Sequence, residues 1–165
     1  MKFKITLKID RKYGDLLPFN YQYEQSAVIY RILAQADTQY SSWLHENGYL
    51  LHERKRFKLF CYSPFIFEKV RPLPEAGCLK IIGERAVWYI SFIPEKSTLE
   101  FIQGIFAHQS FSIGNKKYQV AFDVVGVEAI SMPQLTEQMA FQAMSPICVK
   151  LHEDNKTQYL SPDNP

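Results

Sequence analysis

The chain has 165 residues, of which 47% are hydrophobic and 15% aromatic, with a formal net charge of +2. This length suits one domain with the start of a second, and the apolar content excludes a disordered chain. No apolar run approaches the ~20 residues of a membrane span, and the N-terminus lacks a signal-peptide core, so we expect a cytoplasmic protein without a membrane partner. The three cysteines lie far apart without a CxxC pair, which indicates neither disulfides nor a zinc site.

The charge is uneven along the chain. Residues 1–58 hold ten Lys and Arg against six Asp and Glu, whereas residues 59–165 hold nine against eleven. A basic surface of this kind is typical of proteins that bind an anionic partner. Ordinary solvated lysines are the alternative explanation.

The N-terminal half predicts a strand, two helices and a second strand. Residues 2–9 alternate between apolar and mostly basic side chains, the period of a half-buried strand. A loop at residues 14–18 precedes a helix over residues 22–36, and a shorter helix runs from the Asp37/Thr38 cap to Gly48. The second strand covers residues 56–63. Its alternation predicts an apolar face opposite a basic and aromatic one, formed by Arg56, Lys58, Phe60 and Tyr62.

The C-terminal half predicts more strands and one helix. Residues 79–82 and 87–93 form a β-hairpin around a turn at residues 83–85. A helix capped by Ser97 or Thr98 follows and ends near residues 107–108. After a turn at residues 114–115, a long strand reverses its alternation at Val124–Val125, which indicates a β-bulge.

This order predicts an α+β, ferredoxin-like (RRM-like) βαββαβ domain with an added β-hairpin over residues 1–140. Residues 141–165 then open a second, similar domain that is truncated, so we expect the sequence to be a fragment. A ferredoxin-like sheet carries its helices on one face and can leave the other open. We expect the basic and aromatic faces of the two N-terminal strands on that open face.

The sequence contains no phosphate-binding glycine loop, no HExxH motif and no cluster of metal carboxylates, so we predict neither a cofactor nor a metal. His45 lies in the last turn of its helix, where the helix C-terminus favours the charged imidazolium and therefore proton donation. A surface histidine that caps a carbonyl is the alternative. Tyr30 is either functional or a half-buried core residue, and His52 either functional or a solvated loop residue.

A basic cluster follows His45 and consists of Arg54, Lys55, Arg56 and Lys58. Basic residues interleaved with aromatic ones favour single-stranded RNA, whereas an edge strand protected by lysine is the alternative. RNA cleavage requires a base for the 2′-hydroxyl, an acid for the leaving 5′-oxygen and a cation for the phosphorane charge. His, Tyr and Lys or Arg can fill these three roles.

These residues resemble the CRISPR repeat-processing endoribonucleases of the RAMP superfamily, which cut precursor CRISPR RNA within each repeat. Four segments carry the resemblance: the opening strand with Leu17-Pro18, the helix with Tyr30, residues 44–49 (LHENGY) with 56–60 (RFKLF), and residues 144–149 (MSPICV) with 159–162 (YLSP). Together these segments span nearly the whole chain.

The resemblance implies two tandem ferredoxin-like domains and metal-independent cleavage that leaves a 2′,3′-cyclic phosphate and a 5′-hydroxyl. It places the general acid/base at His45 and a partner tyrosine at Tyr30. The lysine of this family is expected where Leu50 and Leu51 stand, so Lys55 or Arg54 has to serve, and His52 is a competing histidine. The glycine-rich loop of the second domain does not occur, because the seven glycines are dispersed.

We therefore predict a CRISPR repeat endoribonuclease with three catalytic residues, His45, Tyr30 and Lys55. The predicted RNA-binding residues are Arg54, Arg56, Lys58, His52, Lys4 and Lys8. A non-catalytic RAMP-type RNA-binding subunit of a CRISPR effector complex is the alternative, and a protein-interaction module without RNA function is a third. The predicted partner is the repeat transcript, with effector subunits and a second copy of the chain as further candidates.

Overall fold

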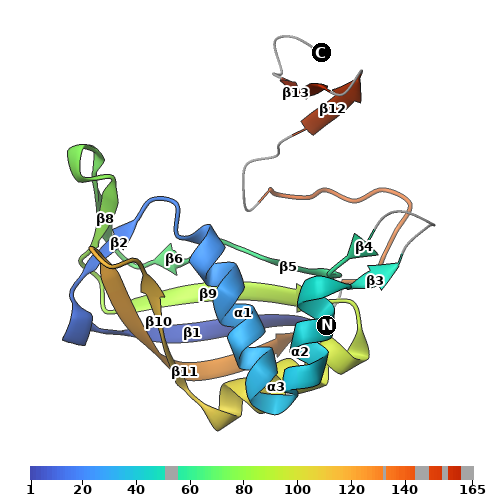
Figure 1. Cartoon of the computed structure of the whole chain (residues 1–165), viewed down its shortest axis with the longest axis horizontal. Coiled ribbons are helices and arrows are strands. Elements are labelled where there is room, and N and C mark those ends of the chain that lie inside the picture. The colour runs from blue at the N-terminus through green and yellow to red at the C-terminus, as the bar shows by residue number, and fades with distance from the viewer. Residues whose placement is uncertain (51–55, 132, 144–148, 154–155, 161–165) are drawn as a thin grey trace. The chain divides into compact units, whose positions relative to one another are not determined.

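A computed structural model describes residues 1–50, 56–131, 133–143, 149–153 and 156–160 (Figure 1). The chain divides into two compact units, Met1–Pro133 and Gln134–Pro165. Unit 1 contains β1 (Lys2–Asp10), η1 (Arg11–Tyr13), β2 (Leu16–Pro18), α1 (Gln22–Ala36), α2 (Thr38–Glu46), β3 (Tyr49–Leu50), β4 (Arg56–Phe57), β5 (Phe60–Tyr62), β6 (Ile66–Phe67), β7 (Val70–Leu73), η2 (Pro74–Ala76), β8 (Cys78–Ile81), β9 (Arg85–Phe92), α3 (Glu95–Ala107), β10 (Ser110–Gly114) and β11 (Gln119–Ile130).

The main sheet of unit 1 has the strand order β10-β11-β1-β9-β5, and β6 pairs with β9 beside β5. All of these pairs are antiparallel. The path β1, α1, β5, β9, α3, β11 is the βαββαβ order of the ferredoxin-like fold. Figure 1 shows α1, α2 and α3 on the same side of this sheet. The predicted fold class is confirmed.

The core lies between the sheet and the helices. The apolar side chains of β1 alternate as predicted, and Phe3, Ile5, Leu7 and Ile9 are all buried. They pack with alternate residues of β9, including Trp88, and with α1 and α3. Helices α1 and α3 approach so closely that a Cβ atom at Gly104 would lie 1.8 Å from the Ile32 carbonyl oxygen. Glycine is therefore required where these helices cross.

The predicted bulge in the last long strand is confirmed. Thr6 pairs with Gly126 and Leu7 with Val124, so Val125 has no partner across the β1–β11 ladder. One extra residue reverses the alternation on the two sides of a bulge. This explains the change of phase in the sequence.

Two predicted elements are wrong in detail. The predicted hairpin between residues 79–82 and 87–93 does not form, because β9 pairs with β1, β5 and β6 in the main sheet. Strand β8 pairs instead with β2 and β7, so the added hairpin is β7–β8, joined by η2. The expected loop at residues 14–18 contains β2, which pairs with β8. The pairings of β9 with β1 and of β2 with β8 are non-local, and a local alternation pattern does not determine them.

The caps of the helices were predicted correctly for α2 but not for α3. The Asp37 side chain accepts a hydrogen bond from the Tyr40 amide at 2.8 Å and caps α2. Helix α3 begins at Glu95 after Pro94 and has no side-chain cap, whereas Ser97 is buried inside it. The Ser97 hydroxyl is hydrogen-bonded to the Tyr40 hydroxyl, which explains why a polar residue occupies this place.

The predicted strand over residues 56–63 is interrupted. Leu59 has φ 55°, in the left-handed region that β-strand residues do not occupy, and it separates β4 from β5. Phe60 and Tyr62 pair with the buried Phe92 and Ile90, so they face the helix side of the sheet. Our prediction that they line the open face is therefore wrong, and Cys61 points to that face instead.

Unit 2 contains β12 (Val149–Glu153) and β13 (Lys156–Leu160), which pair as an antiparallel hairpin. That residues 141–165 open a second ferredoxin-like domain stays a prediction.

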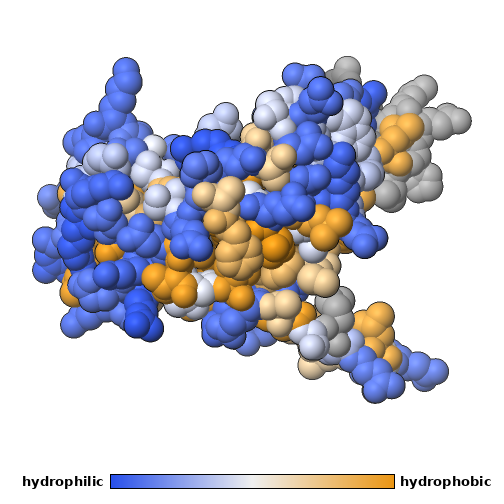
Figure 2. Space-filling view, turned by 90° about the horizontal axis from the view of Figure 1, so that it is seen from below, coloured by the Kyte–Doolittle hydropathy of each residue, from blue (hydrophilic) through white to orange (hydrophobic). Residues whose placement is uncertain are grey.

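Among the described residues, no helix is both long and apolar enough to cross a membrane. The surface around α3 is apolar in the centre of Figure 2, and the exposed residues of this helix include Leu99 and Phe106.

Candidate functional site

His45 lies on an exposed face near the end of α2, as predicted. The helix ends at Glu46, and the Asn47 and Gly48 amides that follow both donate to the Trp43 carbonyl, with Gly48 at φ +69°. A Cβ atom at Gly48 would lie 2.8 Å from the carbonyl oxygen of Phe57 in β4. Glycine therefore lets β4 pass close to the end of the helix that carries His45.

The structure brings Tyr30 and His45 together, although fifteen positions separate them in the sequence. Their rings meet edge to face with centroids 4.9 Å apart and an interplanar angle of 81°. Tyr30 also contacts Phe60 of β5 edge to face at 5.7 Å. A ring held on two sides provides a fixed surface against which the imidazole packs.

Burial raises the pKa of the Tyr30 hydroxyl above its ordinary value, and the nearby Tyr62 hydroxyl raises it further. Both effects favour the neutral phenol, because burial and a second anionic group disfavour the phenolate. At neutral pH Tyr30 therefore carries its proton and is able to donate a hydrogen bond.

The Lys58 side chain is hydrogen-bonded to the same end of α2. Its ammonium donates to the carbonyl oxygens of Leu44 and His45, which have no partner within the helix. Burial lowers the pKa of Lys58, and the neighbouring Arg56 guanidinium lowers it further. The lysine that we predicted to contact RNA is thus a cap for the helix of His45.

Arg56 is exposed and donates to the Asn47 side-chain oxygen at 2.8 Å. Within the part of the chain that the structure describes, neither Arg56 nor Lys58 forms an ion pair with a carboxylate. Their partners are neutral, so both charges contribute to a positive potential at the end of α2.

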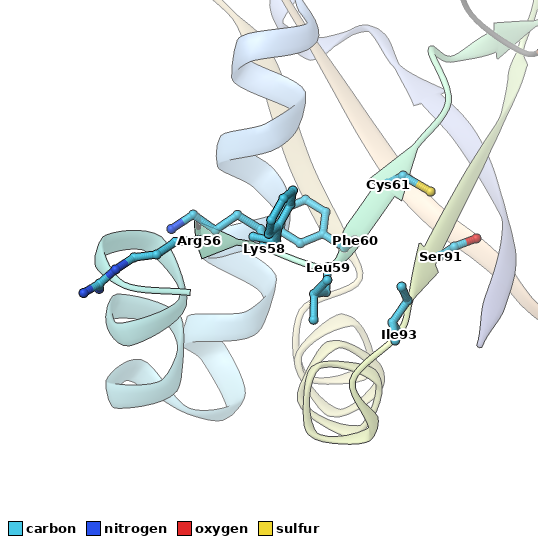
Figure 3. A pocket seen from close by; sticks show the side chains of 8 residues that line it. Arg56, Lys58, Leu59, Phe60, Cys61, Ser91 and Ile93 are labelled. Atoms are coloured by element: carbon cyan, nitrogen blue, oxygen red, sulfur yellow. The ribbon is translucent and has the colours of Figure 1, made fainter. Parts of the chain in front are cut away.

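A cleft of about 460 Å³ begins at these two cations and runs along the edge of the main sheet (Figure 3). It is lined by Arg56, Phe57, Lys58, Leu59, Phe60, Cys61, Ser91 and Ile93. Sequence patterns did not reveal this cleft, because it depends on the left-handed backbone at Leu59 and on Ile93 from a distant part of the chain. The only local signal is the run of basic and aromatic residues.

Lys4 and Lys8, which we also predicted to bind RNA, lie on the helix-free face of the sheet. Lys4 forms an ion pair with Glu128 of β11 at 3.0 Å, and Lys8 lies between Arg85 and Asp123 in the strand register. The structure does not bring Lys4 or Lys8 into the cleft lining. Lys55, Arg54 and His52 lie outside the described residues. No group of three metal-binding side chains occurs among the residues that are described.

Residues 16–123 match the family described as "CRISPR-associated protein Cas6, N-terminal". The match covers more than half of the chain and includes His45, Tyr30 and the cleft. The chain belongs to this family. The predicted resemblance to repeat-processing RAMP proteins is therefore confirmed at the level of the family.

Solved structures with a similar fold match nearly the whole of this chain. "An RAMP protein binding different RNA substrates" is 24% identical, with a TM-score of 0.73 over 99% of this chain and 64% of that one. "Characterization of a Cas6-related gene from Pyrococcus furiosus" is 25% identical, with a TM-score of 0.74 over 98% and 62%. "CRISPR associated protein Cas6" is 24% identical, with a TM-score of 0.66 over 99% and 63%.

This chain thus spans less than two-thirds of the length of each of those structures. A search of curated proteins found no match. These similarities establish the family and the fold of this chain.

Proposed function

We propose that this chain is the catalytic N-terminal domain of an endoribonuclease that cuts CRISPR repeat RNA. The observation that carries the proposal is the pairing of Tyr30 with His45 at a helix end that Lys58 and Arg56 both contact. The family supports RNA as the substrate, and the cations suit its phosphates. The predicted products are a 2′,3′-cyclic phosphate and a 5′-hydroxyl.

In the proposed reaction, the 2′-hydroxyl gives its proton to a water or hydroxide of the solvent as its oxygen attacks the adjacent phosphorus, and the bond from phosphorus to the 5′-oxygen breaks. His45 donates a proton to the leaving 5′-oxygen. Tyr30 is protonated at neutral pH, so we assign it the positioning of His45 and the donation of a hydrogen bond rather than the role of base. Lys55 stays the predicted stabiliser of the phosphorane charge, and Arg56 is a second candidate for this role.

Single-turnover cleavage in EDTA tests this function, with repeat RNA from the organism that encodes the chain. We expect His45→Ala to lower the cleavage rate constant by about 10²–10⁴, the usual contribution of a general acid or base. His108→Ala is the matched control, because His108 is also exposed at the end of a helix. It should leave the rate constant unchanged.

Other outcomes separate the alternatives. Tight binding of RNA without cleavage would favour the non-catalytic RNA-binding subunit. Equal cleavage by the parent and His45→Ala would retain the nuclease but move the proton transfer to His52. Loss of cleavage on addition of EDTA would contradict the metal-independent mechanism.

A further inference from the structure

The cleft at the sheet edge is more apolar than its two cations suggest. Phe57 is 42% exposed and Ile93 is 79% exposed, and Leu59 belongs to the same lining. Large apolar side chains that remain exposed beside a cleft indicate a ligand with a flat or apolar surface. Figure 3 shows Leu59 and Ile93 on one side of the site and the Arg56 and Lys58 side chains on the other.

The backbone at Leu59 maintains this arrangement. A left-handed conformation at a leucine costs about 1 kcal/mol, and the Ile93 amide holds it by donating to the Leu59 carbonyl at 3.0 Å. The turn leaves Phe57 exposed while the next aromatic residue, Phe60, packs against Tyr30. Strain of this kind concentrates at functional sites.

The cleft is also joined to the end of α2. Lys58 donates to the His45 carbonyl, and Arg56 donates to Asn47, two residues further along. One side chain therefore spans the distance between the cleft lining and the residue that we propose as the acid. A nucleotide chain that follows Lys58 from the end of α2 therefore runs toward the cleft.

From this geometry we infer that the cleft binds one unpaired nucleobase of the RNA strand, next to the phosphate that is cut. The base stacks on Phe57 and contacts Leu59 and Ile93, while the exposed Arg56 guanidinium binds a flanking phosphate. Stacking on an aromatic ring suits any base, and Arg matches the geometry and charge of a phosphate. This inference rests on the proposed function, because it takes the same RNA as its ligand.

The test measures binding of the 165-residue chain to repeat RNAs that each lack one base. The variants are Phe57→Ala, Phe57→Trp and, as matched control, Phe19→Ala, whose ring is 40% exposed outside the cleft. We expect Phe57→Ala to weaken binding of intact RNA about tenfold, the effect of one lost stack, and Phe57→Trp to restore it. Phe19→Ala should bind as the parent does.

The RNA scan makes the test specific. At one position, removal of the base should weaken binding by the parent but not by Phe57→Ala, since both changes remove the same contact. Equal loss at every position, or unchanged binding by Phe57→Ala, would overturn the inference. Cleavage separates the two proposals. If one base depends on Phe57 for binding but cleavage does not depend on His45, the base site in the cleft is retained and the nuclease is rejected. If cleavage depends on His45 but no base depends on Phe57, only the base site is rejected.

Discussion

Tyr30 and His45 form the smallest unit on which the proposed activity depends. Burial raises the pKa of the Tyr30 phenol above its ordinary value, so the phenol carries its proton at neutral pH and we do not assign it the role of base. Its contribution is then the ring, which packs edge to face on the imidazole, together with one hydroxyl donor. The ring and the hydroxyl can be removed separately.

We expect Tyr30→Phe to retain cleavage within about tenfold of the parent, because the ring stays and only one hydrogen bond is lost. Tyr30→Leu should lose about 10²-fold, because the imidazole is no longer held in place. The check is the pH–rate profile of single-turnover cleavage. Tyr30→Phe should keep every ionisation of the parent between pH 6 and 9, and loss of one of them would make Tyr30 the base.

At the scale of the elements, a hydroxyl network holds α2 against its neighbours. The Tyr40 hydroxyl of α2 is 2.9 Å from that of Tyr49 in β3 and is also hydrogen-bonded to Ser97 of α3. Burial raises the pKa of Tyr40; the hydrogen bond with Ser97 offsets part of this rise, and the one with Tyr49 adds to it. The folded state therefore keeps a proton that the unfolded state releases near pH 10.

Tyr40→Phe should cost about 1–2 kcal/mol of unfolding free energy at pH 7, because the buried Ser97 hydroxyl loses its partner. The contribution of Tyr40 to the unfolding free energy of the parent is complete below about pH 10. Above that pH the contribution falls by about 1.4 kcal/mol per pH unit. The difference between parent and variant should therefore narrow above pH 10. Urea denaturation measures the unfolding free energies of the parent and the variant, and Tyr23→Phe at an exposed position is the control. A difference between parent and Tyr40→Phe that does not change with pH would contradict the raised pKa of Tyr40.

The crossing of α1 and α3 gives a second prediction at this scale. Gly104→Ala should cost about 3 kcal/mol or prevent folding, because the new methyl group overlaps the Ile32 carbonyl and neither helix can move without disrupting the core. Gln103→Ala, at an exposed position of the same helix, should change stability by less than about 0.5 kcal/mol. Thermal unfolding followed by circular dichroism measures both; a stable Gly104→Ala would show that the helices can separate.

These elements also show what the sequence could predict. Strand β1, helices α1 and α2 and the bulge at Val125 follow from local periodicity and caps, and all were predicted. The partner of β8 and the break at Leu59 were missed, because non-local pairing and a left-handed leucine leave no local pattern. The contact of Tyr30 with His45 became visible only when the fold brought two helices together.

At the scale of the whole sheet, the helix-free face carries less free positive charge than the sequence suggests. Lys4 forms an ion pair and a hydrogen bond with Glu128. The hydrogen bond raises the pKa of Lys4 most, and the negative charge of Glu128 raises it further. Lys8 is exposed and, among the described residues, forms no ion pair. The two lysines that we predicted to bind RNA therefore differ in how available their charges are.

If RNA crosses this face, Lys8→Ala should weaken binding and reduce the slope of log K against log salt by about 0.7, the value for one phosphate of a single strand. Lys4→Ala should have a smaller effect, because its charge is already compensated. Glu128→Gln should strengthen binding and steepen the slope, since it frees Lys4. Glu75→Gln, which removes an equally negative but distant exposed charge on η2, is the control for net charge. Equal slopes for the parent, Lys8→Ala and Glu128→Gln would place the RNA away from these two lysines and leave the cleft at Phe57 as its path.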